Sequence, residues 1–388
     1  MDKDKEEPDA SGFSGELSFV FGSQRPSTVG VSCFSLFPRP AAPRARLSPP
    51  QVGRTKEAQL AHSEELYQQA TAAFERGEHV QAAKHARDSL SLLDSVLEGQ
   101  EGEEDGSRKH PAYINLLYVV GVTSYHAHLQ RGADREGELE NSLSALCECL
   151  VLLRTHRGDE HENTISCARQ VAKVLRERGQ HAEAARVGGS CLGVMRRVLG
   201  DEHEDTLCAM IEQAEVLWEA GERDEAVTLA LEHLALLERV LGEDKAPDIA
   251  RTMHGLLLPL YRVKRYQEGE RLAERCWPLC RQALRAEDPV ALDAMHMLAV
   301  FLYHNDKDER ARNTWKVCLG MYRNAMGEEA PDTLRVKHCF GVASFEAGDR
   351  EGARAVLREC LEQLEDKFGA SHYRVRPTRE ALAMVMLL

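Results

Sequence analysis

Histidine side chains recur in this chain at a spacing that could support binding chemistry. His254, His296 and His338 follow one another at intervals of 42 residues. Because unperturbed imidazole titrates near neutral pH, such a ladder could hold a carboxylate-bearing ligand and respond to pH. The alternative is that a repeated sequence has kept the same residue with no role for its charge. Under either interpretation, the three histidines should lie at equivalent places on equivalent elements.

A second candidate is a basic cluster. Arg169, Lys173 and Arg176 are separated by four and three residues, so on a helix they share one face. Guanidinium and ammonium groups are the usual partners of carboxylates. The cluster therefore predicts a site for an acidic group of a ligand.

The eleven cysteines indicate reduced thiols. They are scattered, no CxxC pair occurs, and Cys147 and Cys149 are the closest two. This pattern is unlike a disulfide framework or a zinc module and predicts a cytoplasmic protein. Five of them recur at one repeat position, where free cysteine would act as a small hydrophobe; a redox- or metal-responsive regulator is the alternative. This cysteine column consists of Ser89, Cys149, Cys191, His233, Cys276, Cys318 and Cys360.

Catalytic motifs are missing from the sequence. There is no Gly-rich phosphate loop, no GxSxG and no HExxH. His126 and His128 are two residues apart, so on a helix they point to different sides. We therefore predict a protein that is not an enzyme and that carries no cofactor and no metal.

An internal repeat supplies the elements that would position these residues. The heptapeptide that begins at Gly158 returns almost unchanged at Gly200, 42 residues later, and a period of this size indicates a stacked array. The spacing predicts an all-α solenoid of about seven antiparallel helix hairpins plus a C-terminal helix over residues 375–388. The expected turn between the two helices of a hairpin falls at Gly77, Gly179, Gly221, Lys264, Asp306 and Gly348.

Small residues mark the places where the two helices of a hairpin can approach closely. One column lies seven residues before the turn, in the first helix, and a second lies five residues after it. The first column is Ala70, Gly121, Ala172, Ala214, Leu257, Ala299 and Gly341, and the second is Ala82, Ala184, Ala226, Gly269, Ala311 and Ala353. Asp159 and Asp201 are N-cap types and are expected to start first helices, whereas His161 and His203 are interpreted as turn residues.

Residues 1–57 differ from the rest of the chain. Pro38, Pro40, Pro43, Pro49 and Pro50 stand among Ser, Gly and Arg, and proline fixes φ and removes a backbone donor. We predict a disordered tail over residues 1–57 and a repeat domain over residues 58–388.

Charge and hydropathy narrow the range of partners. The formal net charge is -14, which disfavours nucleic acid because phosphate binding needs a basic surface. The sequence has no run of about 18 apolar residues, so no membrane span is expected. The acidic balance suits solubility and protein partners of basic or mixed charge.

The repeat resembles the tetratricopeptide repeat, in the 42-residue form found in kinesin light chains. The linkers Gly158–Thr164 and Gly200–Thr206, and Gly327 with Ala330–Thr333, carry the likeness. The resemblance implies a right-handed superhelix, with first helices lining a concave groove that binds a peptide or partner protein. A cargo adaptor of the kinesin-light-chain kind is an alternative. Its mark would be an upstream heptad coiled coil, which residues 1–57 do not show.

The resemblance also places the groove positions, three residues before and four residues after the first small-residue column. Aromatic residues recur at the second of these positions and would suit an extended peptide, although their rings could instead fill space between hairpins. The expected groove residues are Tyr118, Tyr125, Arg169, Lys173, Arg176, Ile211, Trp218, His254, Tyr261, His296, Tyr303, His338 and Phe345.

Overall fold

The computed structural model describes residues 56–98, 111–131, 136–242, 245–284 and 288–387. The described helices fall into two units, an N-terminal unit that ends at Ala226 and a C-terminal unit over Val227–Leu388. Apart from its last two residues, which begin the first helix, the predicted tail lies outside the described residues.

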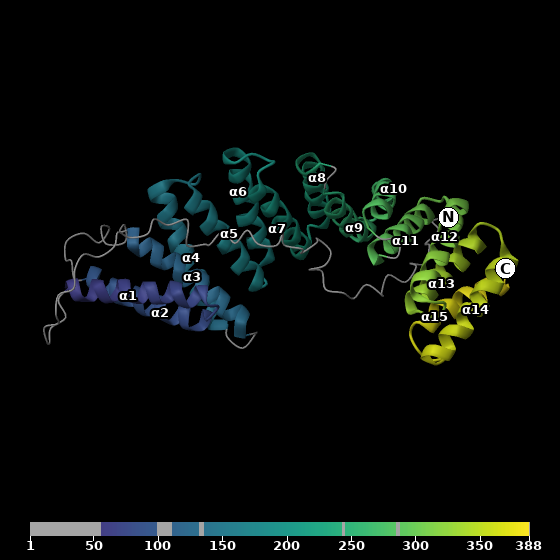
Figure 1. The fold of residues 1–388 in the computed structure, drawn as a ribbon, viewed down its shortest axis with the longest axis horizontal. Coiled ribbons are helices and arrows are strands. Elements are labelled where there is room, and N and C mark those ends of the chain that lie inside the picture. Colours follow the sequence, from purple (N-terminus) through teal and green to yellow (C-terminus); the bar gives the residue numbers. More distant parts are fainter. Residues whose placement is uncertain (1–55, 99–110, 132–135, 243–244, 285–287, 388) are drawn as a thin grey trace. The chain divides into compact units, whose positions relative to one another are not determined.

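Fifteen helices and no strands make up the described part of the chain (Figure 1). The prediction of an all-α protein with seven helix pairs and one further helix is confirmed. The N-terminal unit contains α1 (Lys56–Glu75), α2 (His79–Glu98), α3 (Pro111–Arg131), α4 (Glu136–Arg157), α5 (Glu162–Glu177), α6 (His181–Val198) and α7 (Glu204–Ala220). Helix α8 (Arg223–Leu241) begins in this unit and continues into the next. The C-terminal unit adds α9 (Ala246–Arg262), α10 (Tyr266–Ala283), α11 (Pro289–His304), α12 (Asp308–Met326), α13 (Pro331–Glu346), α14 (Arg350–Phe368) and α15 (Val375–Leu387).

Within each unit every helix packs against the helix that follows it. Thus α1 packs on α2, α2 on α3, and so on to α7, and the same order runs from α9 to α15. The last helix covers the last hairpin, where Ala381, Leu382 and Val385 of α15 pack with Ala353 and Leu357 of α14. Each hairpin therefore buries one face internally and another against the next hairpin, as in a stacked array.

The predicted turn residues end the first helices in the left-handed conformation. At each of them the residue after the turn donates to a carbonyl five residues back, as Gln180 does to Leu175 and Arg265 does to Leu260. This is the Schellman arrangement, which usually needs glycine because its φ is positive. Lys264 and Asp306 occupy the position without being glycine, with φ of 61° and 58°.

Close approach of helices explains the small-residue columns. Ala82, Ala311 and Ala353 have no exposed surface. A Cβ added at Gly269 would overlap the ring of Phe301 on the next first helix. Small side chains at these positions therefore set the distance between helices.

The helix-start expectation was wrong for Asp159 and Asp201. The N-cap of α5 is His161, whose Nδ1 accepts a hydrogen bond from the backbone N–H of Asn163 at 3.1 Å. His203 caps α7 in the same way, at 3.2 Å. An imidazole nitrogen here takes the place of the usual hydroxyl or carboxylate oxygen.

Lys264 offers a direct test of the turn geometry. Replacing it by glycine is expected to stabilise the C-terminal unit by about 1 kcal/mol, because glycine adopts positive φ without the Cβ clash of other residues. The converse change, Gly348→Lys at the equivalent turn of α13 and α14, should destabilise it by a similar amount. Urea unfolding of the two variants beside the wild type would measure both. Unchanged stability in both would show that these turns carry no conformational strain.

Candidate interaction face

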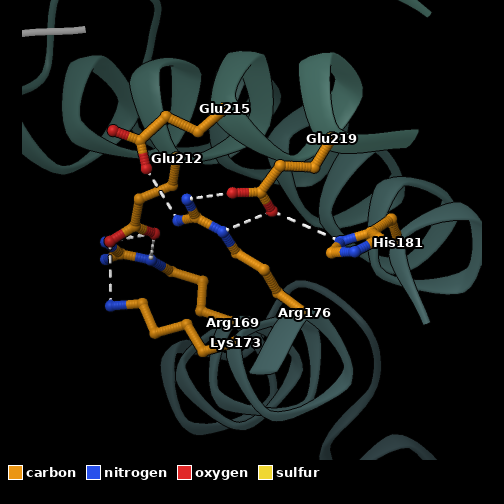
Figure 2. Close-up of polar contacts among 7 residues, drawn as sticks. All are labelled: Arg169, Lys173, Arg176, His181, Glu212, Glu215 and Glu219. Carbon is orange, nitrogen blue, oxygen red and sulfur yellow. Dashed lines mark hydrogen bonds and ion pairs between the residues drawn. The ribbon is translucent and has the colours of Figure 1, made fainter. Parts of the chain in front are cut away.

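The predicted groove residues lie on the first helices of the hairpins, and we call the surface that they form within each unit the first-helix face. In the N-terminal unit it carries an array of ion pairs between α5 and α7 (Figure 2). Arg169 and Lys173 of α5 both reach Glu212 of α7, with Nη2–Oε2 and Nζ–Oε1 distances of 3.1 and 2.8 Å. Burial opposes ionisation of Glu212, but Lys173 and Arg169 outweigh it and lower the pKa of its carboxyl.

Arg176 extends the same array by binding two carboxylates of α7. Its Nη1 lies 2.7 Å from Oε2 of Glu215, and its Nη2 lies 2.6 Å from Oε1 of Glu219 (Figure 2). His181, the first residue of α6, approaches Glu219 with Nδ1 at 3.3 Å from Oε2. Burial raises the pKa of Glu215 above its usual value despite the neighbouring Arg176.

The basic cluster predicted from the sequence is thus paired within the chain. The carboxylates that it was expected to take from a ligand come from the next first helix. The sequence contains the signal, since Glu212, Glu215 and Glu219 share a helical face one repeat after the basic residues. The pattern within a single helix does not reveal this pairing, because the paired residues are 39 to 43 positions apart in the sequence.

The aromatic row is largely buried between repeats. Trp218, Tyr261 and Tyr303 are 6%, 8% and 5% exposed, and Tyr118 is buried as well. Such rings contribute packing area and are poorly placed to meet a ligand. These four predicted groove residues therefore fit the packing interpretation.

A recurrent three-residue contact shows what the aromatic position does. In the α1–α3 region Phe74, His79 and His126 form a ring cluster with centroid separations of 4.9 to 5.1 Å. In the C-terminal unit Tyr261, Tyr266 and His304 occupy the same three repeat positions, with Tyr266 and His304 stacked at 4.5 Å. At the α5–α7 junction the same three repeat positions hold charged or polar side chains instead of rings, namely Arg176, His181 and Glu219. One residue comes from the end of a first helix, one from the start of its second helix and one from the next first helix.

The histidine ladder is built into a polar network of the C-terminal unit. Nε2 of His254 lies 2.9 Å from Oδ2 of Asp293, and Nδ1 of His338 lies 3.1 Å from Oγ1 of Thr378. Burial opposes protonation of His254, but Asp293 outweighs it and raises the His254 pKa. Burial also opposes ionisation of Asp293, yet the hydrogen bond to His254 and the nearby Arg335 lower the Asp293 pKa to about 2. The three histidines therefore occupy equivalent helix positions but differ in their partners.

His296 is the buried member of the ladder. Its Nδ1 lies 3.1 Å from the indole Nε1 of Trp315, and its Nε2 lies 2.8 Å from Nη1 of Arg335. Both neighbours are donors only, so a protonated imidazole would place N–H groups against N–H groups. Burial first, and then the charge of Arg335, lower the His296 pKa to about 3. His296 is thus neutral at physiological pH.

Several predicted residues keep part of their side chains at the surface. This half-buried set is Tyr125, Arg169, Lys173, Arg176, Ile211, His254, His338 and Phe345. Lys173 is among the more accessible charged members, with 36% of its side chain exposed. The part of the first-helix face open to a ligand is therefore mainly polar and charged.

The cysteine column makes one repeated contact. The thiols of Cys191 and Cys360 donate to the carbonyls of Ile165 and Leu334, each 26 residues earlier, at 3.5 and 3.3 Å. Ser89 bonds to the carbonyl of Ser63 in the same way at 2.7 Å. Burial raises the Cys191 pKa to about 11 and the Cys360 pKa to about 12, so both are poor nucleophiles. These contacts support packing as the role of the column.

Two further features, a metal-ligand cluster and a membrane-spanning helix, are absent from the described ranges. No group of three or more His, Cys, Asp or Glu side chains there is placed to hold a metal ion. Of the helices in those ranges, none combines the length and the apolar character that crossing a membrane requires.

The repeat sequence itself matches a known family. Residues 164–205, 214–245 and 291–332 match the tetratricopeptide repeat. The first and last of these stretches take in the hairpins α5–α6 and α11–α12. These stretches are tetratricopeptide repeats. The resemblance predicted from the linker motifs is confirmed.

Solved tetratricopeptide structures resemble the chain at low identity. One is a putative kinesin light chain from Podosopora anserina with nearly identical TPR-like repeats, at 22% identity over 54% of this chain and 99% of that chain, with a TM-score of 0.45. Another is a signal transduction ATPase with a tetratricopeptide repeat sensor from Pyrococcus horikoshii, at 14% identity over 87% of this chain and 50% of that chain, with a TM-score of 0.46. A tetratricopeptide repeat protein from Parabacteroides merdae matches at 15% identity over 84% and 99%, with a TM-score of 0.38. No match was found among the curated proteins.

His296 makes a prediction about pH. The unfolded chain binds a proton at this residue below about pH 6.5, whereas the folded protein resists it until about pH 3. The wild type should therefore lose about 1.4 kcal/mol of stability through this residue for each pH unit below 6.5. His296→Asn keeps an acceptor for Trp315 but does not titrate. As the pH falls below 6.5, the stability of this variant should therefore decrease by about 1.4 kcal/mol less per pH unit than that of the wild type.

Urea unfolding of both proteins at pH 7 and at about pH 5 would measure the difference, about 2 kcal/mol. Parallel pH profiles for the wild type and His296→Asn would contradict the inference that His296 is neutral in the fold.

Proposed function

We propose that this tetratricopeptide-repeat protein is a non-catalytic interaction scaffold that binds a peptide or partner protein on its first-helix face. Tetratricopeptide repeats support protein interaction in general. The observation that carries the proposal is the ion-pair array of α5 and α7, in which Arg169, Lys173 and Arg176 are fixed opposite Glu212, Glu215 and Glu219.

Fixed charges favour binding because less side-chain freedom is lost on association. The guanidinium of Arg176 is held by two carboxylates and Glu212 by two cations, so each group is oriented before a partner arrives. Their half-exposed positions leave lone pairs and N–H groups at the surface. A partner can therefore add hydrogen bonds without having to order these side chains.

The array also indicates the kind of partner. Basic and acidic rows stand side by side, so the surface presents both signs of charge within one repeat step. A polyanion such as nucleic acid would meet the acidic row together with the basic row. A protein segment that carries both acidic and basic residues matches such a surface better.

The half-buried residues of the C-terminal unit extend the proposal. His254, His338 and Phe345 offer imidazole and aromatic groups on the corresponding face of α9 and α13. We further propose a cytoplasmic location, because cysteines recur as free thiols in the described helices, which suits a reducing compartment.

Site-specific photocrosslinking tests the assignment of the face. A benzophenone side chain placed at Tyr125 or Ile211, on first helices of the N-terminal unit, is expected to capture the same partner in cells. The matched control is Val151 of α4, a second-helix residue that is 62% exposed. Equal capture of that partner from Val151 would contradict binding on the first-helix face.

Affinity measurements with the captured partner test the role of charge. Lys173→Ala is expected to weaken binding about three- to tenfold and to reduce its salt dependence, because a charge at the rim of an interface contributes mainly through long-range attraction. Lys316→Ala, a change of an exposed lysine on α12, should leave affinity unchanged. Equal affinities of the wild type and Lys173→Ala at low salt would show that the ion-pair array takes no part in the interface.

A further inference from the structure

Two buried cysteines lie one turn apart on α10. The Sγ atoms of Cys276 and Cys280 are 3.6 Å apart, and neither residue has exposed surface. Cys276 belongs to the cysteine column and lies 3.7 Å from the carbonyl of Ala250. Cys280 lies outside the column, and the residues four positions after Cys318 and Cys360 are a tyrosine and a leucine. The dithiol therefore has no counterpart in α12 or α14 and is not explained by repeat packing.

The helix turn that carries the pair is weakened by a proline. Pro278 lies between the two cysteines inside α10, and proline has no N–H to donate to the carbonyl of Glu274. Cys280 stands in the last turn of a helix that ends at Ala283, where helices open most readily. Opening this turn would give a small reagent access to both sulfur atoms.

The weakened turn also bears on whether the sulfur atoms can bond. In a regular helix the Cβ atoms of residues four apart are about 5–6 Å from each other, whereas a disulfide needs roughly 3.5–4.5 Å. A regular turn would resist this approach. The turn with Pro278 lacks one backbone hydrogen bond, so less free energy is needed to distort it.

The surroundings favour a thiolate at Cys280. The contact with the Cys276 sulfur lowers the Cys280 pKa against the effect of burial; the nearby His254 and Arg251 also lower this pKa, whereas Asp288 raises it. Burial raises the pKa of Cys318, which belongs to the same column. One sulfur of the pair is thus the better nucleophile and the other can resolve it.

We propose that Cys276 and Cys280 form a redox-sensitive dithiol that peroxide converts into an intrahelical disulfide. The Cys280 thiolate attacks one oxygen of hydrogen peroxide, the O–O bond breaks, and the departing hydroxide takes up a proton to give water and a sulfenic acid at Cys280. The sulfur of Cys276 then attacks the Cys280 sulfur, the S–O bond breaks, and hydroxide leaves as a second water with the Cys276 proton. Two thiols are oxidised and one peroxide is reduced to two waters.

Closure of the disulfide would reshape the end of α10. This helix packs against α9 and α11, and α9 supplies His254, which lies near Cys280 and bonds to Asp293 of α11. Shortening the last turn would therefore alter a contact made by both neighbouring first helices. The device is independent of what binds the first-helix face, and its chemistry can be measured without a partner.

The sequence provides a direct assay. Trypsin cleaves after Arg275 and Arg281, which releases residues 276–281 as one peptide holding both cysteines and no others. After treatment of the folded full-length protein with hydrogen peroxide and alkylation of the remaining thiols, this peptide is expected to be two hydrogen atoms lighter and unalkylated. Treatment with dithiothreitol before alkylation should restore the doubly alkylated form.

Two variants make the result decisive. Pro278→Ala keeps both thiols and restores the missing backbone donor, so disulfide formation should slow about fivefold, the effect of one hydrogen bond. Cys318→Ser removes a column cysteine from α12, a different helix, and should leave the rate unchanged. A doubly alkylated peptide after peroxide treatment of wild type, or sulfinic acid at Cys280 in place of the disulfide, would overturn the proposal.

Discussion

Each hairpin buries one face internally and can bury another only against the neighbouring hairpin, and most features of the structure depend on that constraint. At the α1–α3, α5–α7 and α9–α11 junctions three positions meet, at the end of one first helix, at the start of its second helix and on the following first helix. At two junctions the positions hold rings, as in Phe74, His79 and His126. At the α5–α7 junction they hold Arg176, His181 and Glu219. The geometry is constant while the chemistry varies.

The ring clusters and the ion-pair contact differ in the groups that they leave at the surface. Ring clusters remove apolar area from water and contribute stability through burial and ring geometry. Half-exposed ion pairs contribute little to stability, about 0–1 kcal/mol each when accessible to solvent. The α5–α7 junction therefore gives up packing energy that its neighbours obtain. In return it holds charged groups in fixed orientations on the face that we propose binds a partner.

Much of the fold could be predicted from the sequence because it depends on period and residue size. The 42-residue repeat located the hairpins, and the glycine column located their turns, including Lys264 and Asp306, where the residue type alone would not suggest a left-handed turn. The caps of α5 and α7 were mispredicted, because the imidazole nitrogens of His161 and His203 serve where the carboxylates of Asp159 and Asp201 were expected.

The interaction face was harder to predict. Side-chain pairing between repeats depends on which rotamers meet across 39 to 43 residues of chain, and a pattern within one helix does not contain that information. The sequence therefore suggested that the basic cluster was free to bind a ligand. In the structure it forms ion pairs with the carboxylates of Glu212, Glu215 and Glu219. Likewise, the spacing of the aromatic row placed Trp218 and Tyr303 correctly on a helical face without showing that both side chains are buried.

The α9–α10 hairpin combines three features that weaken its backbone. Helix α9 contains Pro259, helix α10 contains Pro278, and Lys264 joins them with φ of 61°. Both helices are thus short of a backbone hydrogen bond, and their connection holds a side chain in a conformation that favours glycine. In a linear array, stability is a sum of local terms and of contacts between neighbours. The α9–α10 hairpin is accordingly where cooperative unfolding of the C-terminal unit would divide, so that the helices from α11 onward behave as a separately protected segment in native-state hydrogen exchange.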